Sequence, residues 1–229
     1  MEINFIGNGS AFSRTNNNAY FIKDNNLYLI DLSMLNMNKI IDTFSFDKYN
    51  SINIIITHMH NDHVSGIPTF LQLLFHKYEI VTNIICPEKL SNDIKTILDI
   101  TGVHKEYYNI IDSNNIEFIL KTILTKHSDS LKNGSYSYLF KLNNKLCLYT
   151  GDTASLDAYN KFINDCDEVY IDTSYNDVSV HVNWSYLKDN LPKCKNIYLM
   201  HLDDEGNLIE EVKKYDNVKV VEIYKGKKL

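Results

Sequence analysis

The segment Thr-His-Met-His-Asn-Asp-His at residues 57–63 limits what this chain can fold into more than any other part of the sequence. It follows residues 51–56, an apolar run that is typical of a buried strand. Two of its histidines alternate along the extended chain, so both imidazoles leave the backbone on the same side. An aspartate and a third histidine follow at once, on a loop that a rigid sheet would position. The pattern predicts a metal site that contains His58, His60, Asp62 and His63.

The residue types of this segment also indicate which ions would bind. Imidazole and carboxylate groups suit zinc and other first-row divalent ions, and no cysteine lies close in sequence. His58 and His60 point one way, whereas the turn at Asp62 and His63 redirects the chain, so the four side chains cannot all close on one ion. We therefore expect two divalent cations side by side, zinc in the first place with manganese or iron as alternatives. Each cation would need further ligands from distant segments.

Three later apolar runs, each typical of a strand, are also followed by a histidine or an aspartate. His127 and His201 each follow or end such a run, and Asp152 lies in a Gly-Asp-Thr sequence after the run between them. Asp152 would equally suit a turn or a helix cap, and His201 would equally suit a strand end before the acidic residues 203–205. We interpret His76 and His104 as structural residues.

The order of these residues, His-x-His-x-Asp-His, then His, then Gly-Asp-Thr, then a strand that ends in His, resembles the metallo-β-lactamase superfamily. The resemblance covers nearly the whole chain and begins at residues 3–12 and 27–31. It implies an α/β fold, an αββα sandwich of two mixed β-sheets covered by helices, formed by residues 1–229 as a single domain. It also implies that His58, His60 and His127 hold one metal, that Asp62, His63 and His201 hold the other, and that Asp152 bridges them.

An aspartate at position 152, where the best-known antibiotic-degrading enzymes have a cysteine, resembles the phosphodiesterase, glyoxalase and lactonase branches. We therefore expect a hydroxide held between two ions to act as the nucleophile at neutral pH. Asp62 would orient the attacking water or accept its proton, and Asp31 would fix an imidazole tautomer. The resemblance to ribonuclease Z-like phosphodiesterases places a leaving-group acid at His181. The alternative for His181 is a surface turn before the helix that begins near Asn183.

Residues 5–12 and 126–130 resemble ribonuclease Z and its smaller phosphodiesterase relatives, among them anti-Pycsar-type cyclic nucleotide phosphodiesterases, more than glyoxalase II. Only 24 residues separate His127 from Asp152, too few for the protruding arm of a tRNA-processing enzyme, and the net charge of −6 does not attract RNA. The predicted substrates are small cyclic nucleotides. A thioester or lactone hydrolase of the glyoxalase II or lactonase type is the alternative, and a tRNA 3′-processing endoribonuclease ranks third. The base of the substrate would stack on Phe12, Tyr136, Tyr175 or Trp184.

Composition limits the remaining choices. With 229 residues, 44% of them hydrophobic and 23% charged, the chain suits one globular domain with a substantial core. The four cysteines have no paired spacing, and neither a signal peptide nor a long apolar run is evident, so we expect a cytoplasmic protein without a membrane partner. A homodimer would match the resemblance. The apolar residues 70–75 would lie in the core or in a dimer contact.

The pattern along the chain predicts alternating strands and helices. Strands are expected at residues 2–6, 18–23, 27–31, 52–56, 80–85, 116–123, 136–142, 145–150, 168–172, 196–200 and 217–223. Helices are expected at residues 35–43, 66–77, 87–100, 154–164, 184–190 and 206–214.

Overall fold

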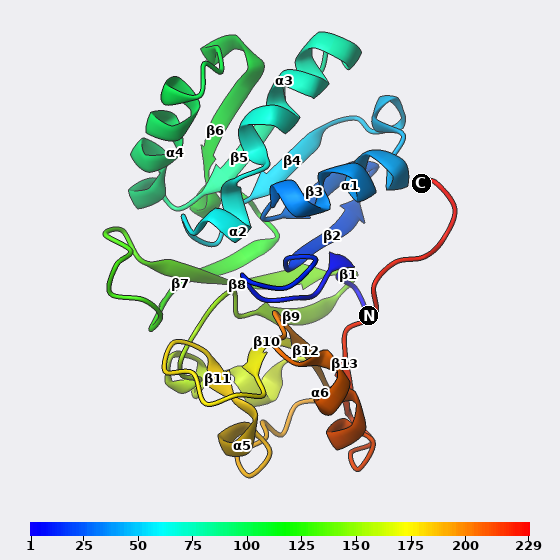
Figure 1. Ribbon diagram of the computed structural model, residues 1–229, viewed down its shortest axis with the longest axis vertical. Coiled ribbons are helices and arrows are strands. Elements are labelled where there is room, and N and C mark those ends of the chain that lie inside the picture. Colours follow the sequence, from blue (N-terminus) through cyan, green and yellow to red (C-terminus); the bar gives the residue numbers. More distant parts are fainter.

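The computed structural model describes residues 1–229 and contains two mixed β-sheets packed face to face, with helices on both outer faces (Figure 1). The expected αββα sandwich is confirmed. The first sheet contains, in spatial order, β1 (Asn4–Gly7), β2 (Asn18–Lys23), β3 (Asn26–Ile30), β4 (Ile52–Ile55), β5 (Thr82–Cys86) and β6 (Tyr108–Asp112). The second contains β13 (Val218–Val220), β12 (Asn196–Met200), β10 (Glu168–Ser174), β9 (Lys145–Tyr149), β8 (Ser135–Leu142) and β7 (Ile119–Thr125).

Each sheet has an antiparallel half and a parallel half. The pairs β1–β2 and β2–β3 are antiparallel, and the strands from β3 to β6 run parallel. In the second sheet β7, β8 and β9 form antiparallel pairs, and β9, β10, β12 and β13 run parallel. A short strand β11 (Val182–Asn183) pairs with the end of β10. Because parallel strands end at the same edge of a sheet, the loops that follow β4, β9, β10 and β12 gather at one rim.

The helices cover the outer faces of the two sheets. Helices α1 (Met37–Thr43), α3 (Ile67–Tyr78) and α4 (Glu88–Ile100) lie on the first sheet, and α5 (Trp184–Leu187) and α6 (Glu205–Val212) lie on the second (Figure 1). The short helix α2 (Asn61–Val64) belongs to the loop that follows β4. None of these helices is long and apolar enough to cross a membrane.

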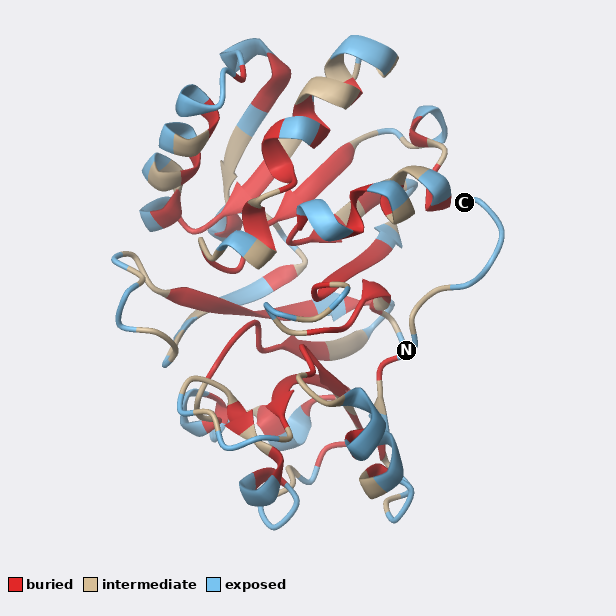
Figure 2. Ribbon diagram, viewed as in Figure 1, coloured by how far each residue is buried: buried red, intermediate tan, exposed pale blue.

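The core is divided by the sheets into three apolar layers, which appear red in Figure 2. Neighbouring residues of a strand face different layers, since side chains alternate across a sheet. In β4, Ile54 faces the helices whereas Ile55 faces the second sheet, and Ile84 and Ile85 of β5 repeat this division. Both faces of these strands are covered, which explains why the strands are continuous apolar runs and not alternating ones.

Besides the short elements α2 and β11, which the sequence did not predict, the structure departs from the sequence prediction in three places. The helix expected at residues 154–164 is replaced by two separate 3-10 turns, Asp157–Tyr159 and Ile163–Asp165. The hydroxyl of Thr153 accepts from the Ser155 N–H and the hydroxyl of Ser155 accepts from the Asp157 N–H, and such local bonds compete with helix formation.

The other two departures concern β6 and α5. Strand β6 was not predicted, because it is an edge strand in which only Tyr108 is buried and its sequence does not alternate. Helix α5 ends at Leu187 and not at residue 190, so it is a single turn.

The apolar residues 70–75 lie in helix α3 and mostly in the core. The side chains of Phe70, Leu71 and Leu74 are buried among the residues between the first sheet and its helices. The ring of Phe70 packs edge-on against Phe46, with 5.4 Å between the ring centroids. The core alternative is therefore confirmed for these three residues, and a dimer contact stays a prediction.

Replacing Phe70 by alanine should lower the free energy of unfolding by about 3–5 kcal/mol, because it removes a fully buried ring and leaves a cavity. Denaturant unfolding of the two proteins measures the difference. The control is Ile100→Ala, since Ile100 is 80% exposed and its loss should cost less than about 0.5 kcal/mol. Equal effects of the two substitutions would contradict this description of the core.

Candidate metal centre

The seven predicted ligands lie together at the rim where the parallel strands of both sheets end. Ligand atoms within 4.8 Å of one another form three overlapping groups, of which the first is His58, His60, His127 and Asp152. The second group is Asp62, His63 and His201, and the third is Asp152, Asp172, His181 and His201. The structure thus brings together the seven predicted ligands and His181, and it adds Asp172.

Asp152 lies at the centre of these groups. Its Oδ2 atom is 3.8 Å from His58 Nε2, 3.5 Å from His63 Nε2, 3.6 Å from His127 Nε2 and 3.4 Å from His201 Nε2. Two of these histidines come from the loop after β4 of the first sheet, and the other two come from the second sheet. One carboxylate oxygen therefore faces four imidazole nitrogens from both sheets.

The backbone before Asp152 depends on a glycine. Gly151 has a φ of +56°, and a Cβ atom at this position would lie 2.7 Å from the Tyr136 carbonyl oxygen and 3.2 Å from Thr57 Cβ. A side chain would therefore be excluded both by the left-handed backbone and by the lack of space. The Gly-Asp-Thr sequence lets β9 end directly beneath the histidine segment.

In the first group three imidazole nitrogens lie so close together that hydrogen bonds among them cannot satisfy all three. His58 Nε2 lies 3.0 Å and His127 Nε2 lies 3.2 Å from the same atom, His60 Nδ1. The Nδ1 atom of His58 is 3.0 Å from the Thr57 hydroxyl, and that of His127 is 2.8 Å from the Val180 carbonyl oxygen, so both Nδ1 atoms carry the proton. Both Nε2 lone pairs then point at His60 Nδ1, which has at most one proton to donate.

Asp62, His63 and His201 form the other side of the centre. Asp62 Oδ2 lies 3.2 Å from His63 Nε2 and 3.4 Å from His201 Nε2. The buried atoms His63 Nε2 and Asp152 Oδ1 have no hydrogen-bond partner within the protein. Orphaned buried donors and lone pairs are costly unless something else satisfies them, and a divalent cation satisfies both imidazole and carboxylate. The donor set therefore fits divalent cations.

Asp31 holds the histidine segment from beneath. It is fully buried and lies at a positive φ of 58°, directly after β3. Its carboxylate accepts hydrogen bonds from the Thr57 N–H at 2.8 Å, the Thr57 hydroxyl at 2.7 Å and His63 Nδ1 at 2.7 Å. The last bond fixes the tautomer of His63 so that Nε2 faces the centre, as the sequence analysis expected of Asp31.

His181 is paired with a carboxylate that the sequence analysis missed. Its Nδ1 donates to Asp172 Oδ2 over 2.7 Å, and the same oxygen accepts the Thr153 N–H at 2.9 Å. The other oxygen of Asp172 lies 3.3 Å from His201 Nδ1 without forming a hydrogen bond. Asp172 lies in β10, two residues before the end of that strand, and Asp31 and Asp152 likewise lie close to strand ends. That signal was present in the sequence.

The charges of the centre perturb its titration. Burial raises the pKa of the Asp152 carboxyl, but His201, His63 and His58 outweigh burial and hold this pKa well below its usual range. Burial lowers the pKa of His201, and the nearby carboxylates of Asp152 and Asp172 reverse this and raise it to about 10. For His58, burial and the neighbouring His63 lower the pKa well below 6.5. The centre thus combines a carboxyl of lowered pKa with one imidazole of lowered pKa, His58, and one of raised pKa, His201.

The prediction of base stacking is wrong for two of the four aromatic residues. The rings of Tyr136 and Trp184 are buried in the core at 6% and 2% exposure, so neither offers a free face. Tyr175 is partly buried against the layer beneath the second sheet. Phe12 is the exception, since its side chain is fully exposed.

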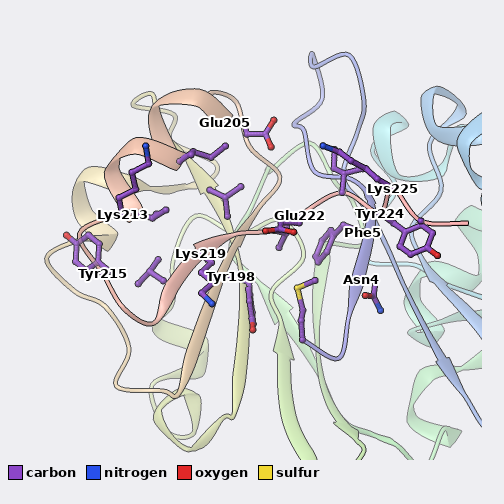
Figure 3. A pocket seen from close by; sticks show the side chains of 18 residues that line it. Asn4, Phe5, Tyr198, Glu205, Lys213, Tyr215, Lys219, Glu222, Tyr224 and Lys225 are labelled. Carbon is purple, nitrogen blue, oxygen red and sulfur yellow. The ribbon is translucent and has the colours of Figure 1, made fainter.

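A hollow lies away from the centre. A groove of about 1040 Å³ runs beside β13 and is lined mainly by apolar residues, among them Phe5, Tyr198 and Ile223 (Figure 3). None of the candidate ligands lines it. The chemical arrangement of the side chains, and not the size of a hollow, therefore identifies the candidate site. His76 and His104 are also distant from the groups and lie near the ring of Tyr107.

Replacing His60 by alanine should reduce the metal content of zinc-loaded protein to at most one ion per chain, because the first group loses one of three imidazoles. Elemental analysis after gel filtration measures the content. The control is His76→Ala, which removes an exposed histidine outside every group and should leave the content unchanged. Unchanged content in both variants would remove His60 from the ligand set.

Similarity to known proteins agrees with this arrangement. The family described as anti-Pycsar protein Apyc1 matches residues 1–224. A ribonuclease Z of Methanococcus maripaludis is 35% identical over 131 residues, which cover 53% of this chain and 41% of that protein. The anti-Pycsar protein Apyc1 of Paenibacillus xerothermodurans is 32% identical over 96 residues, which cover 41% of this chain and 38% of that protein. The matches thus span less than half the length of these curated relatives.

Among solved structures, the metallo-β-lactamase fold protein YhfI of Bacillus subtilis has a TM-score of 0.74. It is 18% identical, and the comparison covers 96% of this chain and 95% of that one, a likeness that shows the fold. The family match extends over nearly the whole chain and includes every residue of the candidate centre. The chain therefore belongs to the anti-Pycsar Apyc1 family of metallo-β-lactamase fold proteins.

Proposed function

We propose that this protein is a dinuclear metal-dependent phosphodiesterase that hydrolyses small cyclic nucleotides. His58, His60 and His127 would hold one divalent ion, Asp62, His63 and His201 would hold the other, and Asp152 would be shared. When bound, two such ions supply a water of lowered pKa and positive charge for the oxygens of a phosphodiester. Zinc is the proposed metal, since each ion would have four protein ligands and all of them are imidazoles or carboxylates.

The pairing of His181 with Asp172 is the observation that carries the choice of reaction. An alkoxide leaves a phosphodiester poorly unless a proton reaches its oxygen as the bond to phosphorus breaks. His181 has Nδ1 occupied by Asp172, so a proton on Nε2 is the one free to move. The ring centroid of His181 lies 4.9 Å from that of His201 and 5.3 Å from that of His127, so the acid adjoins both halves of the centre. Asp62 would accept the proton of the attacking water.

Hydrolysis of a thioester or a lactone is the second candidate, because the same ligand set would serve at a carbonyl carbon. A thiolate leaves without an acid, so hydrolysis of a thioester gives no reason for the His181–Asp172 pair, whereas the alkoxide of a lactone would also need its proton. Cleavage of a tRNA precursor ranks third. The connection between β7 and β8 spans only residues 126–134, and the net charge of −6 gives no general attraction to RNA.

The first test is hydrolysis of 2′,3′- and 3′,5′-cyclic nucleotides by metal-loaded protein. His181→Ala should lower kcat on these substrates by about 10²–10⁴-fold, the usual contribution of a general acid. The loss should be much smaller on bis(p-nitrophenyl) phosphate, since nitrophenolate leaves without a proton. Equal losses on both substrates would contradict the acid role. Activity on thioesters or lactones alone would move the protein to the second candidate, and activity on tRNA precursors alone to the third.

Phe12 is the proposed platform for the base of the substrate. It lies in a turn closed by the bond from the Ser13 N–H to the Ser10 carbonyl oxygen, and the Ser10 N–H donates to the carbonyl of Leu202, next to His201. The Asn16 amide also donates to the Ser10 carbonyl oxygen. A turn whose backbone is bonded to Leu202 thus presents a fully exposed ring, and Leu202 directly follows the candidate ligand His201.

Replacing Phe12 by alanine should raise KM for cyclic nucleotides by about 10-fold or more, because stacking of a base on an aromatic ring contributes about 1–3 kcal/mol. The kcat value should change little. Initial-rate kinetics measure both constants, and Phe12→Trp should retain a low KM. The matched control is Leu35→Ala, another exposed apolar residue, at 57% exposure. A KM unchanged in Phe12→Ala would exclude the platform.

A further inference from the structure

Asp203 is a carboxylate that receives four hydrogen bonds from one short segment. Its Oδ2 accepts from the Ser174 hydroxyl at 2.6 Å, from the Asn176 N–H at 3.1 Å and from the Asn176 side-chain amide at 2.8 Å. Its Oδ1 accepts from the Tyr175 N–H at 2.7 Å. The sequence indicates only an acidic turn here, but nearly all of the hydrogen-bonding capacity of Asp203 is directed at residues 174–176.

The segment that Asp203 holds leads directly to His181. It leaves β10 just after Asp172 and Thr173 and returns as β11, whose residues Val182 and Asn183 pair with the end of β10. None of the residues from 175 to 181 is buried. Tyr175, at the start of the loop, packs partly buried against the layer beneath the second sheet. Beyond it, polar contacts set the position of residues 176–181, and this part opens easily when they are removed.

The polar contacts of this loop lie at two points. At its start, the carbonyl of Asn176 accepts from the Asn183 amide at 2.8 Å, so Asn176 joins both ends of the loop to Asp203. The same carbonyl oxygen lies 2.7 Å from the Ser174 hydroxyl, whose one proton is shared between it and Asp203 Oδ2. Near its end, the carbonyl of Val180 accepts from His127 Nδ1. His181 follows immediately, and its ring reaches Asp172. Asp203 therefore fixes the part of the loop that His127 does not.

Asp203 also belongs to the same short segment as a candidate ligand. His201 ends β12 at a positive φ of 57°, and the chain then places Leu202 against the loop after β1 and Asp203 against the loop after β10. The segment from His201 to Asp203 thus ties the position of the candidate ligand to the position of His181. The residue that caps helix α6 is Asp204, so Asp203 has no part in that cap.

We infer that Asp203 is a positioning residue, which holds the loop of His181 so that the acid faces the leaving oxygen of a substrate bound at the centre. This inference rests on the proposed phosphodiesterase function and deepens it. A carboxylate suits the role because every one of its four partners is a donor. An asparagine in its place would present an amide that donates, so at least one of the four bonds would be lost.

The test compares Asp203→Asn with Asp204→Asn in metal-loaded protein. The two changes remove the same charge from neighbouring residues, but Asp204 caps α6 by accepting from the Asn207 N–H and the Asn207 side chain. Asp203→Asn should lower kcat on cyclic nucleotides by about 10- to 100-fold, a part of what a general acid contributes, and should affect bis(p-nitrophenyl) phosphate less than threefold (about 0.6 kcal/mol). Asp204→Asn should leave both rates within about twofold of the wild type.

Two further measurements separate positioning from a general structural effect. In the His181→Ala background Asp203→Asn should cause no additional loss, since the acid that it positions is already absent. Hydrogen exchange followed by mass spectrometry should show faster exchange in residues 174–183 of Asp203→Asn, with metal content unchanged by elemental analysis. If Asp203→Asn fails to fold, Ser174→Ala removes one of the four donors and should give a smaller loss of the same selectivity.

Several outcomes would overturn the inference. Equal losses on both substrates, a loss that persists in the His181→Ala background, or a fall in metal content would each show that Asp203 acts through something other than the acid. Wild-type rates in both Asp203→Asn and Ser174→Ala would show that the contacts are dispensable. A wild-type protein without activity on either phosphodiester would instead overturn the proposed function, and the role of Asp203 with it.

Discussion

The hydrogen bonds to the buried carboxylate of Asp31 are the contacts on which the candidate centre depends. A buried charge is stable only when surrounding donors compensate it, and Asp31 has three, two from Thr57 and one from His63. These donors lie at the two ends of the segment that contains four candidate ligands. The N–H of Asp31 in turn donates to the carbonyl of Ile55 in β4. One side chain therefore joins the strand pairing of the first sheet to the shape of the histidine loop.

The second requirement is the docking of the two sheets. The loop after β4 belongs to the first sheet, whereas His127, Asp152 and His201 follow strands of the second. Directly below the histidines, the Tyr138 hydroxyl donates to the carbonyl of Ile56 and the Tyr136 N–H donates to the carbonyl of Thr57. Neither sheet alone has a full set of ligands, so metal affinity and the folding of the whole sandwich are linked.

The sequence predicted the local parts of this site better than the parts that depend on packing. Residues 57–63 could be assigned because alternation on a strand and the turn that follows are short-range properties. Asp152 and His201 were ambiguous as single residues, and only their order along the chain, compared with a known superfamily, made them candidates. The structure places them together because the parallel strands of the two sheets end at one rim, a relation that no local pattern contains.

The errors have the same origin. Tyr136 and Trp184 lie near site loops in sequence, but their rings turn into the core, and the direction of a side chain at a strand or helix end depends on the layer that covers it. Asp172 lay in a predicted strand and was taken as part of the sheet. Asp203 appeared to be one of three solvated acids, because its four donors come from a segment almost 30 residues earlier. The helix predicted at residues 154–164 does not form, because the hydroxyls of Thr153 and Ser155 bind backbone N–H groups where it would begin.

Asp31 and His201 share a left-handed backbone, and both adjoin the candidate centre. Residues with side chains avoid this conformation, which costs about 1–2 kcal/mol for each, and glycine would adopt it freely. A glycine would, however, remove the carboxylate that binds the histidine segment or the imidazole that is a candidate ligand. Selection for thermal robustness and selection for the site therefore oppose each other at these two positions. A more thermostable descendant of this protein would therefore gain its stability at other positions and would keep the backbone strain at these two.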